Sequence, residues 1–140
     1  ESWHAAASND ATALRWLGVY KNNPALLKEA LAIDSIDIIS RTQLAKFHLN
    51  QVDYATHHLV ESLFIGSEAE SLEDLAEAKK LIADIQHEAS RQHYAEWHLE
   101  LSSLVNDWLE YKQKPEGKFP EWCKKNGKSY KWPTIVYYDE

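Results

Sequence analysis

Glycine and proline are absent from two long stretches of this chain, residues 25–65 and residues 67–114. These two residue types interrupt regular secondary structure more strongly than any others. Both stretches are rich in alanine, leucine, glutamate and lysine, which have high helix propensities. The chain is therefore expected to be all-α, forming a helical bundle or a short helical-repeat array of about five helices.

The composition changes near residue 115, and this change predicts how the chain is organised. Its 140 residues are enough for one ordinary domain. We expect a helical domain over residues 1–115 and a C-terminal extension over residues 116–140 that packs on it. The extension holds two of the four prolines and many aromatic residues, and a third proline, Pro115, directly precedes it, so it is expected to be irregular. Residues 134–138, with the sequence Thr-Ile-Val-Tyr-Tyr, form the segment with the strongest β character.

Local signals predict where the first two helices begin. Asp10 is a suitable N-cap for a helix over residues 11–21, because its carboxylate can accept hydrogen bonds from free N–H groups. Pro24 suits the first turn of a second helix over residues 25–33, where its missing N–H costs nothing.

The central part of the chain has the apolar spacing of longer helices. Apolar residues recur every three or four positions over residues 41–64, and Gly66 is a natural stop. Ser67 heads a capping-box pattern for the next helix. A single helix over residues 72–112 would be about 60 Å long, which exceeds the width of a compact domain of this size. We therefore expect a bend or break near residues 90–93, where the apolar register slips.

Charge is unevenly distributed along the chain, whose net charge is −7. Residues 66–110 carry eleven acids against three bases, and residues 111–140 carry seven lysines against four acids. An acidic surface attracts basic partners and repels nucleic acid. We expect a partner protein with a basic surface to bind one acidic row: Glu73, Asp74, Glu77, Asp84 and Glu88.

Several classes of protein receive no support from the sequence. There is no apolar run long enough for a transmembrane helix, so no membrane partner is expected. No N-terminal segment has the pattern of a signal peptide, and a cytoplasmic location is expected. The single cysteine, Cys123, cannot form an internal disulfide. No glycine-rich phosphate loop and no Cys-x-x-Cys pair occurs, so no cofactor is expected.

One segment carries the residues of a known helical hairpin. Small, aromatic, turn and closing apolar positions are occupied in order by Leu44-Ala45, His48, Val52-Asp53-Tyr54 and Phe64. A shorter match is Trp16-Leu17-Gly18. These segments resemble tetratricopeptide-type hairpins over about a quarter of the chain. The resemblance implies a helical surface for binding other proteins.

A pair of basic residues suggests an enzymatic alternative. Arg91 and His98 lie seven positions apart, about two helical turns, so both can share one helix face. An arginine followed by a histidine at this spacing resembles the motif of HEPN ribonucleases, which are small all-α domains. The resemblance implies that Arg91 and His98 would be catalytic, activating a ribose hydroxyl and stabilising the phosphorane.

Histidines beside carboxylates suggest a second alternative, a metal-binding helical bundle. His57 and Glu61 are four residues apart, and Asp84 and His87 are three apart, so each pair shares a helix face. Such pairs supply the ligands of di-metal sites in helix bundles. The Glu-x-x-His repeat of di-iron carboxylate bundles is absent, however, as is the His-x-x-x-His pair of a hemerythrin.

The favoured function is a non-catalytic protein-binding module of adaptor or inhibitor type that uses an acidic helical face. In size and charge the chain is similar to bacterial immunity proteins that block a basic toxin. The ribonuclease and the metal-binding bundle stay open as alternatives, and so does assembly into a homodimer.

Overall fold

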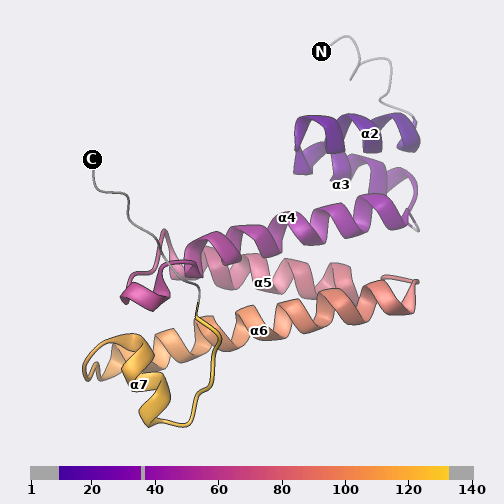
Figure 1. The fold of residues 1–140 in the computed structure, drawn as a ribbon. Coiled ribbons are helices and arrows are strands. Elements are labelled where there is room, and N and C mark those ends of the chain that lie inside the picture. The colour runs from indigo at the N-terminus through magenta and orange to yellow at the C-terminus, as the bar shows by residue number, and fades with distance from the viewer. Residues whose placement is uncertain (1–9, 36, 133–140) are drawn as a thin grey trace, which may run out of the picture.

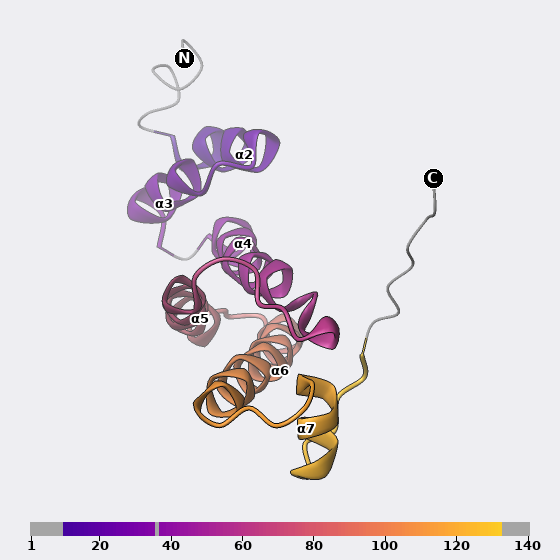
Figure 2. The same ribbon diagram turned by 90° about the vertical axis from the view of Figure 1, so that its left-hand side faces the viewer.

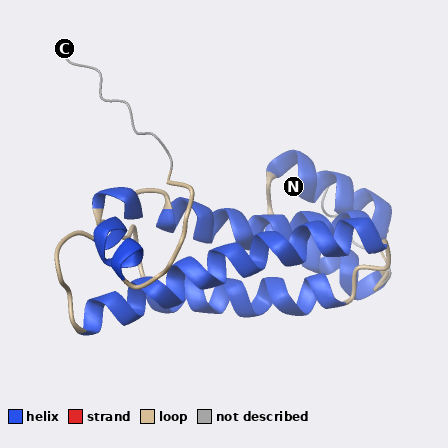
Figure 3. Cartoon of the chain, turned by 60° about the horizontal axis from the view of Figure 1, so that its bottom comes forward, coloured by secondary structure: helices blue, strands red, loops and turns tan. Residues whose placement is uncertain are grey.

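The chain is all-helical in the computed structural model, which describes residues 10–35 and 37–132 (Figures 1 and 3). This confirms the predicted fold class. Over these residues there are six α-helices, one short 3-10 helix and no strand: α2 (Ala11–Lys21), α3 (Pro24–Ile33), α4 (Ile38–Thr56), η1 (Leu59–Glu61), α5 (Glu68–Ala83), α6 (Glu88–Gln113) and α7 (Phe119–Lys125). The expected β segment at residues 134–138 lies outside the described residues.

The starts of three helices lie within one residue of the positions that their sequences predict, and the predicted side-chain caps of two of them are present. Asp10 accepts hydrogen bonds from the N–H groups of Thr12 and Ala13 at the start of α2. Ser67 Oγ accepts one from the Glu70 N–H at the start of α5. Pro24 occupies the first turn of α3, which begins one residue earlier than expected. Each cap satisfies donors that a helix leaves free at its N-terminus.

The helices pack in chain order. Helices α2 and α3 form a hairpin that packs on α4, and α4 also packs against α5 and α6. Viewed nearly end-on, α4, α5 and α6 form a triangle (Figure 2). Their facing apolar side chains make the main core: Ala45, Leu49, Val52, Leu75, Ala78, Ile82, Ile85, Leu101 and Val105. A smaller cluster of Leu14, Leu26 and Ala30 holds α2 against α3.

A separate aromatic cluster joins the C-terminal extension to the rest of the chain. It contains Leu59, Trp108, Tyr111, Phe119, Trp122 and Cys123. Two hydrogen bonds support it: the Phe119 N–H donates to Ser62 Oγ, 57 residues away, over 2.7 Å, and Tyr111 Oη donates to the Gly117 carbonyl over 2.6 Å. The extension therefore packs against η1 and the end of α6. It contains one short helix, α7.

The prediction that the third helix continues to residue 64 is wrong. Helix α4 ends at Thr56, and the chain then turns through η1 and through Ser62, whose φ is +61°. Leu59 is fully buried in the aromatic cluster, and Ser62 bonds the extension. These contacts with residues far along the chain favour a turn over continued helix.

The expected break in the long C-terminal helical region is present, but several residues earlier than predicted. Helix α5 ends at Ala83, and α6 begins at Glu88 with His87 as its N-cap. His87 Nδ1 accepts a hydrogen bond from the Ser90 N–H over 3.2 Å. Ile85 is buried although it lies in the connection. The apolar pattern therefore continues past the end of α5, and this hides the break in the sequence.

No helix in the described residues is both long enough and apolar enough to cross a bilayer.

Candidate binding groove

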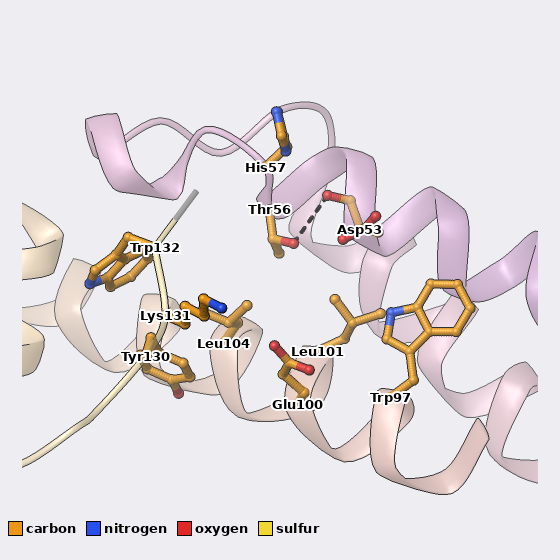
Figure 4. A pocket seen from close by; sticks show the side chains of 10 residues that line it. All are labelled: Asp53, Thr56, His57, Trp97, Glu100, Leu101, Leu104, Tyr130, Lys131 and Trp132. Carbon is orange, nitrogen blue, oxygen red and sulfur yellow. Dashed lines mark hydrogen bonds between the residues drawn. The ribbon is translucent and has the colours of Figure 1, made fainter. Parts of the chain in front are cut away.

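A hollow of about 190 Å³ lies between the last turn of α4, the middle of α6 and the C-terminal extension (Figure 4). We call this hollow the groove. We call residues 127–132, which follow α7 and border the groove, the strap. The groove is lined by Asp53, Thr56, His57, Trp97, Glu100, Leu101, Leu104, Tyr130, Lys131 and Trp132.

The α4 side of the groove is polar because the helix ends there. Thr56 Oγ1 donates to the carbonyl of Val52 over 2.9 Å and to that of Asp53 over 3.3 Å, which occupies two of the carbonyls near the end of the helix (Figure 4). The Asp53 side chain is exposed, and His57 follows as the C-cap residue. The groove therefore has a carboxylate and an imidazole on this side.

The α6 side combines an apolar floor with an acidic edge. Trp97, Leu101 and Leu104 are three or four residues apart, so they lie on one helix face. Leu101 is buried in the main core, whereas Trp97 is only partly buried. Glu100 is exposed beside them. In the described part of the chain neither Glu100 nor Asp53 forms an ion pair, so both carboxylates remain free.

The strap is held on α6 by a buried carboxylate. Asp107 accepts a hydrogen bond from the Tyr130 hydroxyl, and its other oxygen lies 3.3 Å from Lys128 Nζ. The ring of Trp132 lies 5.5 Å from that of Tyr130 and, in an edge-to-face arrangement, 5.7 Å from that of Phe119, measured between ring centroids. These contacts place the strap across α6 and against the groove.

Burial around Asp107 also changes the acidity of its neighbours. Burial raises the pKa of Tyr130 well above its usual value, and the hydrogen bond to Asp107 raises it further. Tyr130 therefore stays neutral and keeps its donor proton. Burial, together with the negative charge of Asp107, raises the pKa of Cys123 to about 11. The thiolate is the nucleophilic form of cysteine, so Cys123 is unreactive at neutral pH.

The five residues of the predicted acidic row differ in their surroundings. Glu73, Glu77 and Glu88 are exposed. Asp74 lies 2.7 Å from His48 Nδ1, and Asp84 lies 3.7 Å from an Arg41 nitrogen. None of the five lines the groove. Glu77 lies 3.5 Å from Lys80 Nζ, and Glu88 accepts a hydrogen bond from Gln92 over 3.4 Å. Their part in binding stays a prediction, to which the structure adds that four of the five carboxylates already have partners.

The residues of the metal alternative lie at opposite ends of the α4–α5 hairpin. His57 and Glu61 follow the end of α4, and Glu61 lies 2.5 Å from the neighbouring His58. Asp84 and His87 lie in the connection between α5 and α6. Across residues 10–35 and 37–132, no group of three or more His, Cys, Asp or Glu side chains is placed to hold a metal ion.

The two residues of the ribonuclease alternative do share one hollow. Arg91 and His98 line a space of about 340 Å³ between α5 and α6. Arg91 donates to the Ile85 carbonyl, and His98 Nε2 lies within hydrogen-bond distance of the Leu75 carbonyl, both at 2.9 Å. Their polar atoms therefore already bind the backbone of α5 and of the turn that follows it.

Sequence reasoning missed the groove and the buried carboxylate beside it. The spacing of Trp97 from Leu101 and Leu104 is typical of a helix core face, and the structure leaves Trp97 only partly buried at the groove. Asp107 carried a detectable signal, because it is an acid between the apolar residues Val105 and Trp108. A buried carboxylate in such a setting requires partners. The partners, Tyr130 and Lys128, lie more than twenty residues away and cannot be identified by spacing.

Comparison with known proteins identifies no relative: no family model, no curated protein and no solved structure matches the chain.

Proposed function

We propose that this protein is a non-catalytic protein-binding module of adaptor or inhibitor type, and that the groove holds an extended basic segment of its partner. The observation that carries the proposal is the lining of the groove. An apolar floor with Trp97 lies beside the unpaired carboxylates of Asp53 and Glu100, and a lysine-bearing stretch of the chain itself lies at one side. Aromatic faces and free carboxylates together favour lysine and arginine side chains.

The order of helix packing supports this proposal. Each helix from α2 to α6 packs on the next, and α4 packs on α6 across one side of the array. Repeat proteins built from stacked helix pairs use such a shared face to bind extended partners. The resemblance to tetratricopeptide-type hairpins agrees with this use. One detail differs, because residues 52–54, which the resemblance places at a turn, lie inside α4.

The acidic surface elsewhere on the molecule adds long-range attraction to the proposal. Glu73 and Glu77 are exposed on α5, and the chain carries a net charge of −7. Surface charge of one sign raises the rate at which oppositely charged partners meet. We therefore assign the α5 carboxylates to association and the groove to retention of the bound segment.

Peptide binding tests this division. The probes are short labelled peptides in which lysine alternates with aromatic residues, with glutamate-for-lysine versions as controls. Replacing both Asp53 and Glu100 by lysine should weaken binding at least tenfold, mainly through faster dissociation, because the retained segment meets repulsion in the groove. Replacing both Glu73 and Glu77 by lysine is the matched charge control. It should slow association and leave dissociation nearly unchanged.

The salt dependence of association, and which of the two double variants loses peptide binding, decide between the possible contact surfaces. Association should slow as the Debye length shortens from about 30 Å at low salt to about 8 Å at physiological ionic strength. Loss of binding only in the α5 variant would place the contact on the acidic row and not in the groove. If both variants bound the lysine peptides as tightly as the wild type does, an acidic binding surface would be refuted altogether. Equally tight binding of the glutamate peptides would refute it too.

A further inference from the structure

We propose that the strap is a built-in occupant of the groove, and that a partner binds by displacing it with a segment of the same pattern, a lysine between two aromatic residues. This inference rests on the proposed function and names both the chemistry of the partner segment and the way in which access to the groove is controlled.

The position of the strap is the first argument. Tyr130, Lys131 and Trp132 are consecutive, and all three line the groove (Figure 4). Lys131 is exposed and lies in the same hollow as Asp53 and Glu100, while the two rings beside it are partly buried. The molecule therefore already places a basic–aromatic segment of its own beside the negatively charged carboxylates of the groove.

The strap is held loosely, which makes displacement feasible. Hollows of about 590 Å³ and 420 Å³ adjoin it, one beside α7 and one beside α6. Over the described residues, the backbone of 129–132 forms no hydrogen bond with another backbone group. Its polar attachments to α6 are made by two side chains, Tyr130 and Lys128, and both end on Asp107. Regions with few backbone bonds and loose packing open at low free-energy cost.

The base of the strap is held firmly, so opening does not require α7 to unfold. The Lys128 N–H donates to the Cys123 carbonyl over 2.8 Å, and Cys123 and Trp122 are buried in the aromatic cluster. Gly127, with φ of +72°, makes the turn between α7 and the strap. A short tether of this kind keeps an occupant near its site at an effective concentration of about millimolar. The strap is therefore a constant competitor for the groove.

Competition in the full-length chain tests this inference. The probe is a fluorescent peptide with the sequence of residues 126–132. Lys131→Glu places a negative charge beside Asp53 and Glu100, so it should release the strap and leave the groove lining on α4 and α6 intact. This chain should bind the probe at least tenfold more tightly than the wild type does. Trp132→Ala provides a second route to the same release.

Two controls separate the strap from general charge effects. Lys118→Glu makes the same charge change at an exposed site outside the groove, and it should bind the probe as the wild type does. A probe with glutamate in place of its second lysine should bind none of the chains. Helix content by circular dichroism should be unchanged in Lys131→Glu and Lys118→Glu, because Lys131 and Lys118 are exposed.

The outcomes distinguish this inference from the proposed function. Equal probe affinity in the wild-type and strap variants would overturn the competition, and if Asp53→Lys with Glu100→Lys abolished that affinity, the groove would still be a binding site. Absence of probe binding in every chain would overturn the proposed pattern, and the peptide panel would then decide the proposed function. Tighter binding in Lys118→Glu as well would also refute a role specific to the strap.

Discussion

Replacing Phe119 by alanine should destabilise the whole domain, because this ring is at the centre of the aromatic cluster. Phe119 is 0% exposed. Its ring lies 5.3–6.0 Å, centroid to centroid, from four others: Trp108, Tyr111, Trp122 and Trp132. Removing a buried phenylalanine ring typically costs about 3–5 kcal/mol through lost burial and the cavity left behind. Domains of this size are stable by about 5–15 kcal/mol, so the variant should fold but with a much smaller margin.

Urea unfolding followed by circular dichroism measures this loss. With a slope of about 2 kcal/mol per molar urea, the midpoint for Phe119→Ala should fall by about 1.5–2.5 M. Tyr20→Ala is the matched aromatic control, because Tyr20 is 89% exposed on α2 and should change stability by less than about 0.5 kcal/mol. A loss below about 1 kcal/mol for Phe119→Ala would refute the reasoning, since it would mean that the extension is not part of the cooperative unit.

Two further substitutions test local features of the packing and the charges. Gly18→Ala should cost about 1 kcal/mol in a thermal melt, because the new methyl would meet Leu27 at 2.9 Å and the strain of overpacking outweighs the gain in helix propensity; higher stability would contradict the close approach of α2 and α3. Glu68→Gln should flatten the loss of stability at acidic pH, since hydrogen bonds from Lys112 and Trp108 hold the pKa of Glu68 below its usual value of 4.5. The stabilising effect of Glu68 is therefore complete above pH 4.5 and is lost as the pH falls through the lowered folded-state pKa. The unfolding curves of the wild type and of Glu68→Gln should therefore differ above that pKa and coincide below it.

The helices were predictable where their signals are local. Asp10 and Ser67 bond N–H groups two or three residues away, so the sequence alone identifies the starts of α2 and α5. The absence of glycine and proline from residues 25–65 and 67–114 predicted the all-α class for the same reason. Helix propensity and capping depend on residues within about one helical turn, so both can be recognised in the sequence.

The helix ends that were wrong depend on distant contacts. Residues 57–65 contain no glycine or proline, so nothing local stops α4 at Thr56. The stop follows from the burial of Leu59 against the aromatic cluster and from the bond between Ser62 and Phe119, which is 57 residues away. Tertiary contacts can contribute more free energy than the difference in helix propensity between residues, so they can override that propensity.

The groove could not be predicted because three separated segments form it. Asp53 and Glu100 are 47 positions apart, and they line one hollow only because α4 packs on α6. The attachment of Tyr130 to Asp107 spans 23 positions. Composition indicated an acidic centre, a lysine-rich C-terminal part and an extension that packs on the helical domain. Which carboxylates face the extension depends on the packing of the helices.

The single cysteine of the chain can report how often α7 separates from α6. Cys123 is buried in the aromatic cluster that carries the strap, and its raised pKa suppresses the reactive thiolate further. A thiol reagent can modify it only in molecules whose α7 has transiently separated from α6. The modification rate, compared with that of an unfolded chain, therefore measures the free energy of that opening without an introduced label. Changes in that rate on adding a ligand would show how far displacement of the strap spreads into α7.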